Sequence, residues 1–556
     1  MKSKKILASL LACAMISTTL LLAGCDNDKE PSPITDKPDA EQIINIIGYD
    51  YKTLDPALGS DAETFTTFTQ VYEGLTKEVM KNGKVTTELA GAASITPNAD
   101  KTVYTIKLRD SKWSDGKQVT AHDYEFSWKR QCDPKNASDY ISFLDEIGVK
   151  GAAEFAAEKG SADGVGVKAL DDKTLQVTLK QPTAYFESAL AFKGLVPGRK
   201  DLADAQGDKY GTDFTKMVYN GPFVIADYQK GSKIVYKKNE NYWNAKEVKL
   251  LNANAHIIEE PATMVKMFES KELDMTGATG DDLNKLKERA KSKEFGYFPS
   301  IDASAYYIYL NVQRDVLKNE KVRRALSLAF NRQQFLDVVF KRHVASNGAV
   351  PPEMTIGNKE YRKEVPEPLK ALKEDPKKLM EEGLKELGIT DPSKVKLLLL
   401  NGKSNAVRKA SSEYIQKFYN DTFGINIEIK YTVDSPTYFT ERTEGNFDIC
   451  TGGWGADYVD INSFFATFLS DNQNNNGKYN NPEYDRLVKE AAKELDPAKR
   501  LANYRKAEEL LIAKDAAVVP TYYQDINNFR HNYVKEMYIP KFGGYYDLAK
   551  VYLSGK

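Results

Sequence analysis

Few residues of this 556-residue chain stand in patterns that could do covalent chemistry. The sequence contains no Gly-x-Ser-x-Gly nucleophile turn, no His-Glu-x-x-His zinc motif and no kinase motif set. Gly402-Lys403-Ser404 matches the end of a phosphate-binding loop, but Leu397 stands where such a loop needs its first glycine. Carboxylates are abundant, yet no short motif isolates a catalytic pair. We therefore expect a protein that is not an enzyme.

Metal and cofactor chemistry is equally poorly indicated. The histidines are His122, His256, His343 and His531, and they are scattered without the spacing of metal ligands. No motif for an organic cofactor is present either. We expect neither a transition metal nor a cofactor.

One loop has the spacing of a calcium site but not its charge. Asn472, Asn474, Asn476, Gly477 and Glu483 occupy positions 1, 3, 5, 6 and 12 of a twelve-residue calcium loop. Amides stand where carboxylates usually bind Ca²⁺, so Glu483 would be the main anion. An ordinary Asn/Gly-rich turn is the favoured interpretation, and calcium binding stays open.

The elements that must position any site mix strands and helices throughout. Strand-like runs occur at 102–108, 174–179, 234–236, 395–400 and 425–431. Asn481-Pro482 and Asp496-Pro497 each predict the start of a helix, the second extending to about Ala513. This mixing over some 500 residues predicts α/β domains. The balance of 78 basic against 79 acidic residues disfavours a nucleic-acid partner.

The N-terminal residues have the pattern of an export signal. Lys2, Lys4 and Lys5 precede an uncharged run from Ile6 to Ala23, which is typical of a secretory signal over residues 1–24. Leu22-Ala23-Gly24-Cys25 resembles the lipobox of bacterial lipoproteins, which implies that Cys25 carries lipid. Residues 25–40 then form a polar tether. A membrane-spanning helix is the alternative to the signal peptide.

Beyond the signal and Cys25, the body contains two cysteines. Cys132 and Cys450 could pair in an oxidising compartment, but two residues give no disulfide framework. Two unpaired, buried thiols are the favoured interpretation.

Several longer strings follow one another along the chain, namely Leu54-Asp55-Pro56, Tyr72-Glu73-Gly74-Leu75, Trp113-Ser114-Asp115-Gly116, Asn220-Gly221-Pro222-Phe223, Val322-Arg323-Arg324-Ala325-Leu326 and Gly453-Trp454-Gly455-Ala456-Asp457-Tyr458. In sequence and in order they resemble the peptide-binding proteins of bacterial ABC importers, family 5 of the extracellular solute-binding proteins, and among them the oligopeptide-binding branch.

This resemblance implies a periplasmic-binding-protein type II-like α/β fold, with two lobes that close over an extended peptide and an extra small domain, three domains in all. Lobe I would comprise residues 40–72, 194–303 and 525–556. The extra domain would comprise residues 73–193, and lobe II residues 304–524.

The resemblance also implies the site residues. Asp457 stands where the family pairs an acid with the free α-amino group of the peptide, and this role is favoured over the alternative of a turn-capping acid. Gly453 and Gly455 match positions whose backbone runs beside the peptide, and Trp454 would pack under the site. Tyr306 and Tyr307 resemble an aromatic run at the start of lobe II, with core packing as an equal alternative for Tyr306.

The chain also departs from the family pattern. Some relatives form a disulfide through a cysteine in place of Gly455, but here Gly455 and Ser304 replace both partners. Basic residues for the peptide's C-terminus are not recognisable at Thr451 and Val407. Arg442 and Arg408 are nearby candidates, but solvated surface charge is the favoured interpretation of each.

The expected function is therefore an oligopeptide receptor, monomeric and anchored by lipid to the outer face of a bacterial membrane, in a Gram-positive cell. Its expected partners are the permease and ATPase subunits of an ABC importer. The alternatives are the same scaffold for another solute, namely a dipeptide, a peptide pheromone, nickel, haem or an oligosaccharide, or a surface hydrolase.

Overall fold

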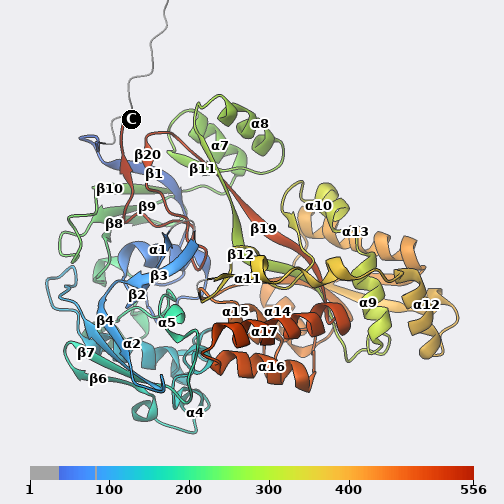
Figure 1. The fold of residues 1–556 in the computed structure, drawn as a ribbon. Coiled ribbons are helices and arrows are strands. Elements are labelled where there is room, and N and C mark those ends of the chain that lie inside the picture. The colour runs from blue at the N-terminus through green and yellow to red at the C-terminus, as the bar shows by residue number, and fades with distance from the viewer. Residues whose placement is uncertain (1–36, 82–83, 358) are drawn as a thin grey trace, which may run out of the picture.

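The computed structural model describes residues 37–81, 84–357 and 359–556 (Figure 1). Strands and helices interleave along the chain, which confirms the predicted α/β class. All five expected strands are present, as β5 (Val103–Leu108), β7 (Thr174–Thr178), β9 (Lys233–Lys238), β16 (Lys396–Asn401) and β17 (Asn426–Tyr431). The signal segment, Cys25 and most of the tether lie outside the described residues, so their roles stay predictions.

The two expected helices are also present, as α16 (Pro482–Lys493) and α17 (Pro497–Glu508). The side chains of Asn481 and Asp496 accept hydrogen bonds from backbone N–H groups of the first turn, and proline follows each cap. A π-helix, Glu509–Lys514, continues α17 to the expected end.

A first sheet contains β1 (Ile43–Gly48), β8 (Phe223–Gln229), β9 and β10 (Asn252–Ile257), in the order β1-β10-β9-β8. Helix α1 (Ala62–Val71) packs against it, and the Thr67 hydroxyl shares a 3.0 Å hydrogen bond with the Tyr236 hydroxyl of β9. Helices α7 (Pro261–Glu269) and α8 (Gly280–Lys291) enclose a separate small core around Phe268 and Phe529.

A second, antiparallel sheet has the order β4-β5-β7-β6, with β4 at Ala92–Pro97 and β6 at Val167–Asp171. Helix α2 (Ala121–Gln131) packs on β6 and β7. The hairpin of β2 (Thr76–Lys81) and β3 (Lys84–Leu89) precedes it. All these elements fall within residues 73–193, the range expected for the extra domain.

The third and largest sheet contains β11 (Met275–Gly277), β12 (Gly296–Leu310), β16, β17, β18 (Ile449–Gly455) and β19 (Val518–Arg530), in the order β11-β19-β12-β18-β16-β17. Strand β16 is parallel to both β17 and β18. The helices around it are α9 (Glu320–Ala329), α10 (Arg332–Val339), α12 (Pro376–Glu386), α13 (Ala406–Phe423), α14 (Ser435–Glu444), α16 and α17.

Two long paired strands connect the parts of the molecule. Figure 1 shows β12 and β19 side by side between the part that holds β1 and β10 and the part that holds α9 and α13. Their pairing is interrupted between Ile301 and Ala305. The expected boundaries of the lobes, after residues 303 and 524, fall inside these strands, beside the interruption. An irregularity in a ladder bends the strand locally, so the division into lobes at this place is supported physically but stays a prediction.

The cysteine prediction is confirmed, because Cys132 and Cys450 are free and buried. In the Asn472 loop, the Asn472 side chain accepts a hydrogen bond from the backbone of Asn474 (2.8 Å), and Glu483 pairs with Arg486 (2.7 Å). The described residues contain no cluster of three or more His, Cys, Asp or Glu side chains that could hold a metal ion. None of their helices is long and apolar enough to cross a membrane.

Candidate functional site

The candidate site is built around an unpaired stretch of β18. On one side, β18 pairs with β12 along its whole length, from Ile449 opposite Leu310 to Gly455 opposite Ser304. On the other side, β16 pairs only with Ile449 and Cys450. Among the described residues, no strand covers 451–455 on that side. Those five residues therefore present an edge that no described strand covers, which we call the free edge. At its start the Thr451 carbonyl accepts a hydrogen bond from the Tyr438 hydroxyl.

Two of the three glycines of this edge, Gly453 and Gly455, have different surroundings. A Cβ on Gly453 would lie 2.7 Å from the Tyr306 ring and 2.9 Å from the Ala305 carbonyl oxygen, so this position is glycine because β12 packs against it. A Cβ on Gly455 would meet no atom within 4 Å. Gly455 is exposed and lines a cavity. Its counterpart Ser304 lies directly opposite on β12, so the residues expected to replace a disulfide are indeed neighbours.

Asp457 lies two residues beyond the free edge and is partly buried. Its backbone N–H donates to the Ser463 hydroxyl (3.1 Å), and its carboxylate accepts a hydrogen bond from the Tyr140 hydroxyl (3.0 Å). Burial raises the pKa of Asp457 to about 7, the negative charge of Glu146 adds to that effect, and the hydrogen bond from Tyr140 opposes it. Among the described residues, no cation forms an ion pair with it. Asp457 is thus a carboxyl that lacks a counter-ion.

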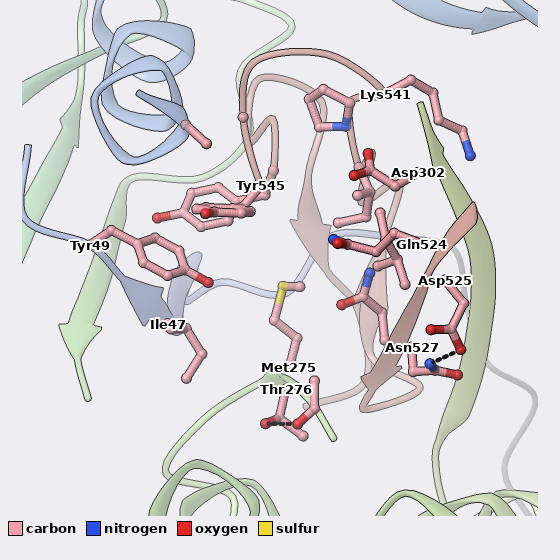
Figure 2. Close-up of a pocket in the computed structure, with 18 of the residues that line it drawn as sticks. Ile47, Tyr49, Met275, Thr276, Asp302, Gln524, Asp525, Asn527, Lys541 and Tyr545 are labelled. Carbon is pink, nitrogen blue, oxygen red and sulfur yellow. Dashed lines mark hydrogen bonds between the residues drawn. The ribbon is translucent and has the colours of Figure 1, made fainter. Parts of the chain in front are cut away.

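A cavity of about 490 Å³ opens beside the end of β18 (Figure 2). Gly455 and Ala456 form one part of its wall. Ile47, Tyr49, Met275 and Tyr545 form an apolar part from the region of β1 and β11, while Asp302, Gln524, Asp525 and Asn527 add polar groups from β12 and β19. The cavity thus lies between the first sheet and the largest sheet, at the interruption of β12.

Two cations of this cavity were not found from the sequence. Arg342 lies 3.2 Å from Asp525, and Lys541 lies 2.7 Å from Glu353. Although burial alone would raise the pKa of Asp525, hydrogen bonds from His343 and Asn527 and the charge of Arg342 lower it to about 2. No local pattern marks these residues, because their partners lie more than 180 positions away in the chain.

The remaining expected site residues lie deeper. Tyr306 stacks on Tyr522, with ring centroids 4.5 Å apart, and its hydroxyl donates to Gln524 of the cavity wall (3.0 Å). Tyr307 is only 1% exposed, and its hydroxyl donates to the Ala349 carbonyl. The Trp454 indole N–H donates to the Ser463 hydroxyl (3.2 Å), the same oxygen that holds Asp457. Trp454 thus belongs to the edge itself, Tyr306 lies beside the edge on β12, and Tyr307 lies in the core.

Comparisons with known proteins agree with this architecture. The family described as "Bacterial extracellular solute-binding proteins, family 5 Middle" matches residues 86–476. The periplasmic oligopeptide-binding protein OppA of Salmonella typhimurium is 31% identical over 523 residues, 92% of this chain and 92% of that protein. A dipeptide-binding protein of Lactococcus lactis is 29% identical, again with 92% of both chains covered.

Solved structures show the same similarity. Listeria monocytogenes OppA bound to peptide superimposes with a TM-score of 0.75 at 30% identity, covering 93% of this chain and 99% of that one. The expected two-lobed α/β fold of periplasmic binding proteins is therefore confirmed. From the family match and the extent of these similarities, the chain belongs to family 5 of the bacterial extracellular solute-binding proteins.

Proposed function

We propose that this protein is an extracytoplasmic receptor that captures oligopeptides and delivers them to an ABC importer. The observation that carries the proposal is the free edge of β18 at 451–455, which ends two residues before the carboxyl of Asp457. A strand edge followed by a carboxyl group can bind an extended peptide whose amino end is positively charged. The names of the relatives, which refer to oligopeptide and dipeptide binding, support the same ligand class.

The peptide would add to β18 as a further strand. Backbone N–H and C=O groups are the same in every peptide, so pairing with an edge gives affinity without demanding one sequence. Strand β16 occupies the edge up to Cys450, which leaves five residues, or about 16 Å at about 3.3 Å per residue. The backbone of Gly453 would run beside the peptide, and Gly455 would let the peptide backbone approach closely.

The amino end of the peptide would bind Asp457. An ammonium removed from water needs a charge partner, and Asp457 forms no ion pair within the described residues. Tyr140, whose hydroxyl already donates to the Asp457 carboxylate, would keep this hydrogen bond beside the ammonium. Tyr306 would lie near the ligand and act on it through Gln524, to which its hydroxyl donates. Trp454 and Tyr307 would stabilise β18 by packing.

The cavity would receive ligand side chains. Its apolar wall includes Met264 and Met275, whose flexible side chains adapt to different shapes. Arg342 and Lys541 would supply positive charge for acidic side chains or a terminal carboxylate. This combination fits a receptor with broad side-chain tolerance.

Anchoring and partners complete the proposal. Lipid on Cys25 would hold a monomeric receptor at the outer face of the cell membrane, where permease and ATPase subunits accept the peptide. Replacing Cys25 with serine should release the protein from the membrane fraction into the medium. Retention of the Cys25→Ser protein in washed membranes would contradict this anchor.

Mass spectrometry of the small molecules that co-purify with the protein tests the ligand class. We expect a ladder of heterogeneous peptides with free amino ends. A single sugar, a metal chelate or one defined peptide would contradict the broad specificity. Hydrolysis of an added peptide would instead revive the enzyme alternative.

A further inference from the structure

The orientation of Asp457 depends on the loop that carries it. Within that loop, the Asp460 N–H donates to the Tyr458 carbonyl (2.7 Å) and the Asn462 N–H donates to the Asp460 carboxylate (2.8 Å). The Asn462 side chain also donates to the Tyr458 hydroxyl (2.9 Å). Asp460 therefore stabilises the loop through both its backbone and its side chain.

A buried ion pair fixes Asp460 from outside the loop. The guanidinium of Arg500, on α17, donates to both Asp460 oxygens, at 2.7 and 2.6 Å. Their side chains are only 5% and 4% exposed. Arg500 also donates to the Ala491 carbonyl at the end of α16 (3.1 Å), and its neighbour Tyr504 donates to Asn462 (2.7 Å). A planar, two-pronged guanidinium fixes both the position and the angle of a carboxylate, which a lysine ammonium does not.

The segment 73–193 contacts the same assembly. Tyr185 stacks on Tyr458, with centroids 5.1 Å apart and planes 6° apart. The Ala184 N–H donates to the Ala492 carbonyl (2.9 Å), one residue beyond the carbonyl that Arg500 binds. Since Tyr140 of the same segment bonds Asp457, this segment contacts both the loop and α16.

We propose that Arg500 is a positioning residue for ligand recognition. It holds the loop in the conformation in which Asp457 faces the amino end of the peptide and the segment 73–193 packs against the loop. The inference rests on the proposed function of Asp457. Arg500 lies on α17, 43 positions after Asp457 in the sequence, and acts on the ligand through Asp460 rather than by contact.

A double-mutant cycle tests this role, with penta-alanine and N-acetyl-penta-alanine as probes and calorimetry as the measurement. We expect Arg500→Lys to weaken penta-alanine binding about tenfold or more, because lysine keeps the charge but loses the two-pronged geometry. In the Asp457→Asn background, the same change should alter affinity less than about twofold, because coupled residues are non-additive. Binding of the acetylated probe should be weak in every variant.

Arg486→Lys is the matched control, since Arg486 lies on the exposed side of α16 and pairs with Glu483 and Glu490. It should leave both affinities unchanged. Additive effects of Arg500→Lys and Asp457→Asn, or an Arg500→Lys protein with wild-type affinity, would overturn the positioning role alone. Equal wild-type affinity for both probes would instead overturn the proposed function of Asp457, and with it this inference.

If Arg500→Lys does not fold, the paired replacement Arg500→Met with Asp460→Leu removes both buried charges together, a change that proteins often tolerate. We expect this variant to melt near the wild-type temperature yet to lose the preference for penta-alanine over its acetylated form. A folded double variant that keeps the preference would show that the ion pair serves stability only.

Discussion

At the scale of single residues, Asp457 is a carboxyl in a partly buried place, with a tyrosine and a second acid nearby and no counter-ion among the described residues. Such a group has an unfavourable charge until a cation arrives. Pairing with Asp457 would therefore stabilise the charge of a bound peptide ammonium, and the ammonium would stabilise the charge of Asp457. This pairing leads to two predictions for the residue.

Asp457→Asn should weaken binding of a peptide with a free amino end by about 2–5 kcal/mol, because the ammonium loses its charge partner. Isothermal titration calorimetry with the co-purified peptides measures the loss. Asp471→Asn, which changes an exposed acid paired with Lys489, is the matched control and should leave affinity intact. Near-unchanged affinity of the Asp457→Asn protein would remove Asp457 from the site.

Peptide affinity should also depend on pH. The free protein holds the pKa of Asp457 near 7, and a bound ammonium would lower it. Affinity is then full above pH 7 and falls, by up to about tenfold per unit, as the pH drops below 7. It should fall again above about pH 8, where the peptide amine loses its proton. The acid limb should disappear in the Asp457→Asn protein; an acid limb that persists would point to another group.

At the scale of elements, we expect β18 to contact both β12 and the peptide, and two of its three glycines, Gly453 and Gly455, to distinguish these contacts. Gly453→Val would place methyl groups against Tyr306 and the Ala305 carbonyl, so we expect a loss of about 1–3 kcal/mol in the free energy of unfolding. Gly455→Val meets open space and should melt near the wild-type temperature, yet bind peptide at least about tenfold more weakly, because the new side chain fills the ligand's side of the strand. Thermal melts and calorimetry on the two variants give both values. Unimpaired binding by Gly455→Val would place the peptide elsewhere.

At the scale of the whole molecule, the two buried thiols report on separate cores. Cys132 belongs to the core that joins the first and second sheets, and Cys450 to a core of the largest sheet. Burial raises the pKa of each thiol to about 12, so neither should react with a maleimide in the native protein at pH 7.

Pulse labelling in rising denaturant, read by mass spectrometry of the peptides that contain each thiol, should show different midpoints for Cys132 and Cys450. A bound peptide that contacts both parts should shift both midpoints upward, since a ligand of the native state stabilises whatever it joins. A shift at Cys450 alone would mean that the ligand rests on one part only. Fast labelling without denaturant would contradict the buried placement.

Much of this protein is determined by its sequence. The proline-led caps at Asn481 and Asp496 act within a single helical turn, and the β-rich runs need only their own residues, so these elements appear where local patterns place them. The strings around Trp454 and Asp457 likewise lie within a few residues and identify the family.

Only the tertiary structure decided which side chains meet. Tyr306 and Tyr307 are neighbours of one type, but successive residues of a strand face opposite sides, and packing against other elements leaves Tyr306 near the cavity and buries Tyr307. Tyr140, Arg342 and Lys541 reach Asp457 or the cavity from distant segments, because strand pairing and helix docking bring them there. Arg500 likewise reaches Asp460, in the loop that carries Asp457, from α17. Local patterns carry no record of such contacts. The free edge of β18 also results from tertiary structure. Strand β16 ends at Asn401 after pairing with only two residues of β18, which leaves the rest of β18 without a described partner strand on that side.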